Sequence, residues 1–375
     1  MTDPVSYIDS TMPGAGCRDQ GYYLCEPHSI ATDEQRSVVA RLALSLAKVG
    51  ERSPMAADLL RVCAFLDADA IPEEIFQAGA EELEETLAVV TNDRLKLTSA
   101  IDEASRYSLL LRHPQSRTFS LSRLAQVTLQ YEMEESERRR WAEVAVRLLN
   151  RAFPLVEYDN WLHCARLVPH VQEIAKAIDE FDFVFPEAAR LLHQAGYYLL
   201  ERAQYEKAEL LMRQALQMDE TIFGPDHPRV ATVLNNLATL LKDTNRMAEA
   251  ELMLRRALQI DENQFGSDDQ IVAVDLNNLA TLLQATSRLT EAELLMRRAL
   301  QMDEINFGPD HPRVAINLNN LATLLKDTYR LAEAESLLRR VVDIFEKSLG
   351  PDHPYTHIGA ENYNAVRHEF TELRY

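Results

Sequence analysis

Apolar residues in the second half of the chain recur with the spacing of amphipathic helices. In ATVLNNLATLLKD, residues 231–243, apolar side chains from Leu234 to Leu241 fall on one helical face. Asn235 and Asn236 lie in the middle of this predicted helix. An asparagine there costs roughly 0.6 kcal/mol relative to alanine, because its amide competes for backbone hydrogen bonds. Two adjacent asparagines therefore require a structural or functional reason.

The asparagine pair belongs to an internal repeat with a period of 42 residues. LNNLATLL occurs at 234–241, 276–283 and 318–325, and GPDHP occurs at 224–228, 308–312 and 350–354, with the degenerate GSDDQ at 266–270. Each unit contains a first helix that carries the asparagines, a short polar turn and a second helix. Because one such pair cannot bury its apolar face by itself, we expect successive pairs to stack into a solenoid.

The repeated GPDHP motif predicts how one unit is joined to the next. We expect its glycine to adopt the left-handed helical conformation after the second helix, and its second proline to begin the next helix. Asp226, Asp310 and Asp352 are expected to accept hydrogen bonds from the free N–H groups of that helix. Each second helix also carries a Glu and an Arg four residues apart, which support a helix on an exposed face: Glu209/Arg213, Glu251/Arg255, Glu293/Arg297 and Glu335/Arg339.

Large and small apolar residues alternate along each pair of helices in a series that resembles the tetratricopeptide repeat. The series in one unit is Leu237, Ala238, Leu241, Ala250, Leu254 and Ala257. The period, LNNLA and GPDHP make the chain similar to the kinesin-light-chain-like type. The resemblance implies an all-α fold with a right-handed solenoid of four repeats over 186–353, followed by a capping helix in 354–375. The first repeat is divergent, with Gly196 and Ala208 at its small positions.

In tetratricopeptide proteins the first helices line a concave groove, and this resemblance implies a groove for a protein or peptide ligand. The candidate binding residues are Asn235, Asn236, Thr239, Lys242, Asn277, Asn278, Thr281, Gln284, Asn319, Asn320, Thr323 and Lys326, with His193, Gln194 and Tyr197 in the divergent repeat. A carboxamide has two donors and two acceptor lone pairs, so a row of them can bind the backbone of an extended peptide. The alternative is that the asparagines only bridge neighbouring first helices, and both interpretations can hold together.

The first half of the chain contains the stretches SPMAADLLRVCAFLDADAIPEEIF, RYSLLLR and FSLSRLAQ. On these stretches it resembles the winged-helix segment of bacterial signal-transduction NTPases with NB-ARC-like (STAND) modules. We expect a winged-helix-like domain over 31–132, with helices at about 33–49, 53–66, 71–79 and 81–106, one small β-hairpin, and another helix from Leu121. A helical connector over 133–185 would follow it. Residues 1–30 show no periodicity and are interpreted as an irregular tail or remnant.

Two departures from that family argue against nucleotide binding by this chain. No GxxxxGK[ST] motif is present to cradle phosphates. Ser122 occupies the position of the histidine that contacts the nucleotide in the family. The stretch at the position of a DNA-recognition helix, 81–95, begins with a run of carboxylates that would repel phosphates.

The formal charge of −20 argues against a nucleic-acid or anionic-membrane partner, since both require basic surfaces. Cys17, Cys25, Cys63 and Cys164 lack CxxC spacing, which favours reduced thiols in a cytoplasmic protein. We recognise neither a signal peptide nor an apolar run long enough to span a membrane.

No catalytic motif such as GxSxG or HExxH occurs, and histidines in successive GPDHP loops would lie about 10 Å apart, too far to share a metal ion. The sequence therefore predicts a non-catalytic interaction scaffold without cofactor or metal, and leaves its oligomeric state open. The alternative is a regulatory arm of a truncated STAND-type NTPase that acts with a separate ATPase module.

Overall fold

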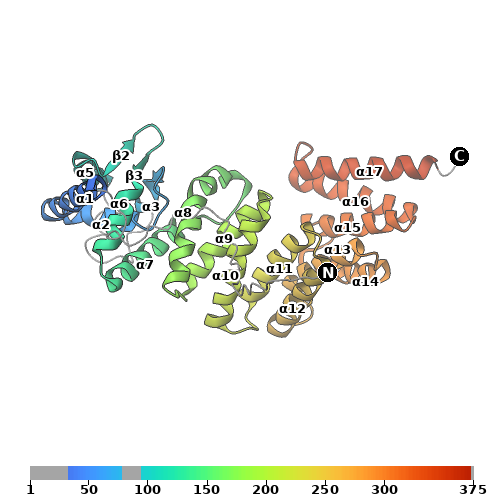
Figure 1. Cartoon of the computed structure of the whole chain (residues 1–375). Helices are drawn as coiled ribbons and strands as arrows, with labels where there is room; N and C mark the ends of the chain where they lie inside the picture. The colour runs from blue at the N-terminus through green and yellow to red at the C-terminus, as the bar shows by residue number, and fades with distance from the viewer. Residues whose placement is uncertain (1–32, 78–93, 373–375) are drawn as a thin grey trace, which may run out of the picture.

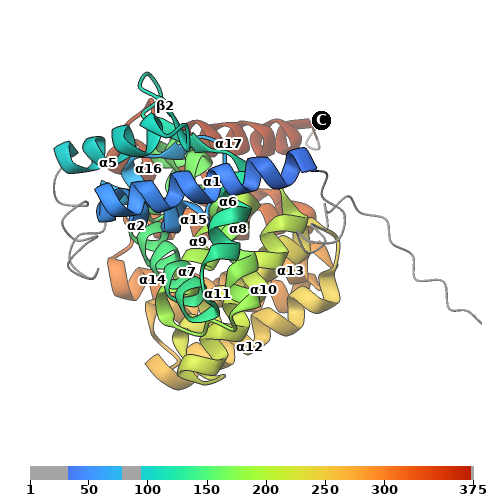
Figure 2. The same ribbon diagram turned by 60° about the vertical axis from the view of Figure 1, so that its left-hand side comes forward.

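The computed structural model describes residues 33–77 and 94–372, whose helices follow one another in chain order along the molecule (Figure 1). The predicted tail at 1–30 lies outside the described residues, as does the acidic stretch 81–95 except for its last two residues. The all-helical solenoid that the sequence predicts is confirmed. Figure 2 views the molecule more nearly along its length, with α1 in front and α17 behind.

The first part of the chain combines helices with a small antiparallel sheet. Its elements are α1 (Asp33–Arg52), α2 (Pro54–Cys63), β1 (Ile71–Pro72), α3 (Glu74–Gln77), α5 (Arg94–Arg106), β2 (Leu110–His113), β3 (Thr118–Leu121) and α6 (Arg123–Glu132). The predicted hairpin is formed by β2 and β3. The helix expected from residue 71 was wrong at its start, because Ile71 and Pro72 pair with β3 and make a third strand. Ile71 is fully buried there beside Phe119.

Helix α6 is fixed to the C-terminal end of α2 by side-chain amides. Ser122 begins the helix, and its Oγ accepts the N–H of Ala125 at 3.1 Å. Gln126 Nε2 donates to the carbonyl of Leu66 at 2.7 Å, and Gln130 Nε2 donates to that of Ala64 at 2.6 Å. These bonds satisfy the carbonyls of two residues that follow the end of α2.

A connector and the repeat array complete the fold. The connector contains α7 (Glu135–Ala152), η1 (Tyr158–Asn160) and α8 (Trp161–Glu180). The paired helices that follow are α9 (Pro186–Glu201) with α10 (Tyr205–Phe223), α11 (Pro228–Asp243) with α12 (Met247–Phe265), α13 (Gln270–Ala285) with α14 (Leu289–Phe307), and α15 (Pro312–Asp327) with α16 (Leu331–Leu349). Helix α17 (Pro354–Glu372) packs on α16 at the end of the array.

The linker glycines differ from the prediction. Gly266 has φ 91° and ψ 158°, and Gly224, Gly308 and Gly350 are alike, whereas a left-handed helical residue has ψ near 47°. This mirror-β region is essentially restricted to glycine. The linker therefore requires glycine for this extended conformation with positive φ, and not for the left-handed helical one. Within the repeats, the non-glycine residues with positive φ lie in the turn between the two helices and are Ala203, Asn245, Ser287 and Tyr329.

The helix caps also differ from the prediction. His227 Nδ1 accepts the N–H of Arg229 and His311 Nδ1 that of Arg313, each at 3.2 Å. The capping side chain of GPDHP is therefore the histidine and not the aspartate before it. The imidazole is held in place by stacking on a phenylalanine at the end of the preceding helix, as His227 does on Phe223 with ring centroids 4.7 Å apart.

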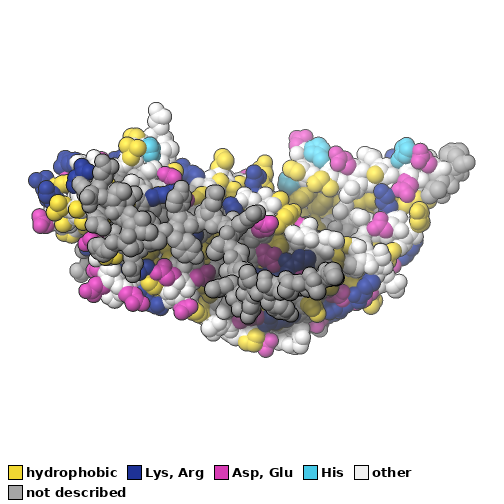
Figure 3. Space-filling view, in the orientation of Figure 1, with side chains coloured by type: hydrophobic (Ala, Val, Ile, Leu, Met, Phe, Trp, Pro, Cys, Tyr) yellow, Lys and Arg dark blue, Asp and Glu magenta, His cyan; other side chains and the backbone are white. Residues whose placement is uncertain are grey.

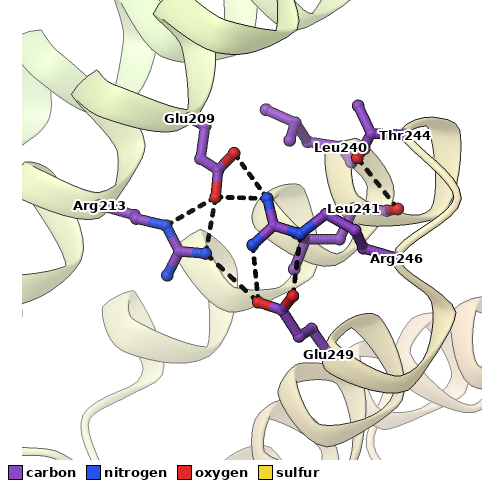
Figure 4. Close-up of polar contacts among 7 residues, drawn as sticks. All are labelled: Glu209, Arg213, Leu240, Leu241, Thr244, Arg246 and Glu249. Carbon is purple, nitrogen blue, oxygen red and sulfur yellow. Dashed lines mark hydrogen bonds and ion pairs between the residues drawn. The ribbon is translucent and has the colours of Figure 1, made fainter. Parts of the chain in front are cut away.

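The Glu–Arg pairs of the second helices also join neighbouring repeats. Glu209 accepts hydrogen bonds from Arg213 in its own helix and from Arg246 at the start of the next second helix, and Arg246 also pairs with Glu249 (Figure 4). Glu251 is shared in the same way by Arg255 and Arg288, and Glu293 by Arg297 and Arg330. The sequence spacing reveals only the bond within one helix.

Candidate functional site

The asparagines of successive first helices form a hydrogen-bonded ladder. In each bond the residue at the position of the second asparagine donates Nδ2 to Oδ1 of the first asparagine in the first helix of the preceding repeat. The bonds are Asn278 to Asn235 at 3.4 Å, Asn320 to Asn277 at 3.1 Å, and Asn362 to Asn319 at 2.9 Å. Bridging of neighbouring first helices, which the sequence left as an alternative, is therefore present.

A histidine takes the place of an asparagine at the start of the ladder. His193 Nε2 lies 2.8 Å from Asn236 Nδ2. Burial, followed by the nearby charge of Arg229, lowers the pKa of His193 to about 4. The ring is thus neutral at neutral pH, accepts through Nε2 and carries its proton on Nδ1. The divergent first repeat keeps the ladder with a different side chain.

The ladder leaves part of each carboxamide available. All six predicted asparagines are half-buried, neither fully exposed nor sealed inside. Within 33–77 and 94–372, no hydrogen bond engages Nδ2 of Asn277 and Asn319, or Oδ1 of Asn278 and Asn320. The row therefore offers donors and acceptors in turn, which is what an extended backbone with free N–H and C=O groups requires.

The threonines beside the ladder are oriented by their own helices. Thr239 Oγ1 donates to the carbonyl of Asn235 at 3.1 Å, Thr281 to that of Asn278 at 2.8 Å, and Thr323 to that of Asn319 at 2.9 Å. Their hydroxyl protons are used within the helix, so these side chains present acceptor lone pairs to a ligand.

The remaining predicted residues are engaged in different ways. Gln284 donates to Asp327 at 2.6 Å, and Lys326 Nζ lies 3.6 Å from Glu369. Gln194 Oε1 accepts the N–H of Val156 in the connector at 3.3 Å. Tyr197 is half-buried, which raises its pKa. Lys242 is half-buried near the C-terminal end of α11.

The structure adds a row of exposed aliphatic residues that the sequence analysis missed. Val274, Ile316 and Ile358 lie at one position of α13, α15 and α17 and are 41%, 42% and 49% exposed. Each precedes the second asparagine by four residues, which places it on the same helical face one turn away. Their spacing of 42 residues was visible in the sequence, and so was Asn362, which extends the ladder to α17.

The described surface carries charges of both signs, with Lys and Arg among Asp and Glu over the face in Figure 3. Among the described residues, no group of three or more His, Cys, Asp or Glu is arranged to hold a metal ion. In the same part of the chain, no helix is both long and apolar enough to cross a bilayer.

Two family models match the sequence. The model described as tetratricopeptide repeat matches residues 187–263 and 270–347, so this part of the chain consists of tetratricopeptide repeats. A domain of unknown function, DUF7779, matches residues 47–138. The winged-helix assignment of that region stays a prediction. Neither description names an enzymatic family, and no curated protein matches the sequence.

Several solved structures are similar to this chain. BtubC (BKLC) from P. vanneervenii is 22% identical with a TM-score of 0.45, and the match covers 56% of this chain and 82% of that one. A Podosopora anserina protein assigned as a kinesin light chain with nearly identical TPR-like repeats is 20% identical with a TM-score of 0.43, over 49% and 89% of the two chains. PH0952 from Pyrococcus horikoshii, a Signal Transduction ATPase with Numerous Domains with a tetratricopeptide repeat sensor, is 12% identical with a TM-score of 0.41, over 84% and 48%.

Proposed function

We propose that this chain, whose second half consists of tetratricopeptide repeats, is a non-catalytic scaffold that binds an extended peptide or partner segment along its first helices. The observation that supports this most directly is the unused hydrogen-bonding capacity of the ladder. Asn277 and Asn319 accept a bond from the next helix and keep a free NH₂ group on the same half-buried row. A ligand backbone can occupy these groups without breaking the bonds between repeats.

The neighbouring side chains add to the proposed recognition. The aliphatic row of Val274, Ile316 and Ile358 provides apolar contact on one side of the asparagines. The threonine hydroxyls provide acceptors on the other side. A partner segment that places apolar side chains over the aliphatic row and its backbone over the asparagines would use both features, and the ladder would hold the helices at a fixed spacing.

The test separates ligand binding from the structural role of the ladder. Asn277→Asp and Asn319→Asp keep the Oδ1 acceptor of each ladder bond, replace the free NH₂ donor with an acceptor oxygen and add a negative charge. Gln259→Glu and Gln301→Glu make the same change of charge and shape at exposed positions of α12 and α14 and serve as the matched control. Peptides selected from a displayed random library on the full chain would be measured by fluorescence anisotropy.

We expect the double Asn→Asp variant to lose about tenfold or more in affinity, since each donor bond to a ligand contributes about 0.5–1.5 kcal/mol. The control pair should bind as the parent chain does. Equal affinity in both variants, with an unchanged circular dichroism spectrum, would remove the asparagines from the binding mechanism. Binding that responds instead to substitutions within 31–185 would favour the regulatory-arm alternative.

A further inference from the structure

Three second helices carry an aspartate at one position, and all three are buried. Asp219, Asp261 and Asp303 are each at most 3% exposed. In two of these repeats an arginine compensates the charge, and in the later of the two an amide donor does so as well. Asp219 lies 3.3 Å from Nε of Arg229, and Asp303 lies 3.8 Å from that of Arg313.

The donor in the last of these repeats is Asn317. Its Nδ2 donates to Asp303 Oδ2 at 2.9 Å, across 14 residues of sequence. Asn317 is itself buried. This pair shows the geometry that the two equivalent positions adopt when one side chain can donate and the other is a carboxylate.

The intervening repeat changes each compensating residue. In GSDDQ, Asp269 replaces the histidine of GPDHP, and Ile271 replaces the arginine that follows it. Asp275 stands at the position of Asn317, which places its buried carboxyl group against that of Asp261. Asp261 thus faces a second buried carboxyl group in place of an amide, an arginine and a histidine.

Two ionised carboxylates cannot make this contact, because each has only acceptors and their charges repel at hydrogen-bond distance. Asn235 Nδ2 already donates to Asp275 Oδ1 at 2.6 Å. Among the described residues, Asp261 Oδ1 and Asp275 Oδ2 are buried without a hydrogen-bond partner, as are Asp219 Oδ1 and Asp303 Oδ1, but only the latter two carboxylates have an arginine within 4 Å. For Asp261 and Asp275 the missing donor is supplied most simply by a proton on one of the two carboxyl groups.

We propose that Asp261 and Asp275 share one proton in the folded chain, which makes the packing of α12 on α13 sensitive to pH. The pair is joined to the candidate site, since Asn235 bonds Asp275 and also accepts Nδ2 of Asn278. Loss of the proton would place two charges in contact and loosen the array at this repeat. This inference does not require the proposed peptide binding.

The surrounding groups support retention of the proton. Burial is the largest cause that raises the pKa of Asp275 to about 7, and the charges of Asp261 and Glu262 act in the same direction while the bond from Asn235 opposes them. Burial and Asp269 raise the pKa of Asp261 as well. Arg298 of α14 pairs with Glu262 at 3.1 Å, and Arg313 donates to the carbonyl of Gln270 at the start of α13.

The sign of the effect on stability follows from proton linkage. The folded chain holds the proton up to about pH 7, whereas an unfolded aspartate releases it near pH 4. Between these values the folded state binds more protons, so its stability falls as the pH rises. The contribution is fully present below about pH 4, and no further change is expected above the folded pKa.

The direct test observes the carboxyl carbons of the full chain, labelled with ¹³C at aspartate, between pH 4 and 9. We expect one resonance to titrate near pH 7 and to be absent from Asp275→Asn, in which an amide restores the arrangement of the next repeat. If all aspartate resonances finish titrating below pH 5.5, the shared proton does not exist.

Urea unfolding of the same variants provides the second test. At each pH we compare the equilibrium constant for unfolding of the parent chain with that of Asp275→Asn. The ratio of parent to variant should rise about tenfold per pH unit between pH 5 and 7 and then level off. Asn317→Asp places a carboxyl pair in the repeat that keeps Arg313 and His311, and should show a smaller dependence. Parallel pH profiles for the parent and Asp275→Asn would overturn the proposal.

Discussion

Helices α9 and α10 approach each other at Gly196, where the other repeats have alanine. A Cβ at Gly196 would lie 2.7 Å from Met212 Cγ, 3.3 Å from the carbonyl oxygen of Ala208 and 3.4 Å from the backbone N of Met212. The first contact is shorter than carbon atoms tolerate, and Met212 is fully buried, which limits its movement. Gly196→Ala should therefore push α9 away from α10.

The magnitude follows from two opposing terms. Inserting a methyl group into a packed core costs about 1–3 kcal/mol. Replacing glycine by alanine inside a helix gains about 1 kcal/mol. We therefore expect Gly196→Ala to reduce the free energy of unfolding by about 1 kcal/mol, within a range of roughly 0 to 2.

Gly359 in α17 provides the matched control. A Cβ there would meet only side-chain atoms, the nearest being Val341 Cγ1 at 3.1 Å and Phe345 Cδ2 at 3.5 Å. Gly359→Ala gains the same helix propensity with a smaller steric cost, so it should be neutral or stabilising. Urea unfolding of the full chain, followed by circular dichroism, compares the two. Equal stabilisation by both substitutions would refute the close approach at Gly196.

Two further predictions concern the linker glycines and a buried histidine. Gly308→Ala places a side chain at φ 87° and should destabilise the chain by about 1–3 kcal/mol, measured as a lower urea midpoint; an unchanged midpoint would contradict the conformational requirement. Burial lowers the pKa of His170 to about 4, so the folded chain should lose stability as the pH falls from about 6.5 towards 4, while the unfolded chain takes up the proton. His170→Gln should flatten this acid-side loss in urea midpoints at pH 7 and 5, and an equal loss in both chains would assign it to other groups.

The repeat architecture was predictable because the sequence repeats its packing positions in register. The period of 42 residues, the alternation of large and small apolar residues and the prolines at helix starts predict paired helices, and the structure has paired helices from Pro186 to Leu349. Ala238, which occupies one of the repeated small-residue positions, is buried in the array. The two-residue strand β1 was missed, because Ile71–Pro72 becomes a strand only by pairing with β3, which lies 46 residues further along the chain.

The sequence by itself determined which asparagines, threonines and aspartates recur on the first and second helices, since a helix fixes the face on which each position falls. The tertiary structure decided what each side chain contacts. Stacking brings residues 43 positions apart into hydrogen-bond range, which turns isolated asparagines into a ladder and leaves their remaining donors and acceptors open. Stacking also buries Asp275 beside Asp261. Because burial disfavours the ionised form, it raises the pKa of Asp275, which the residue type by itself does not reveal.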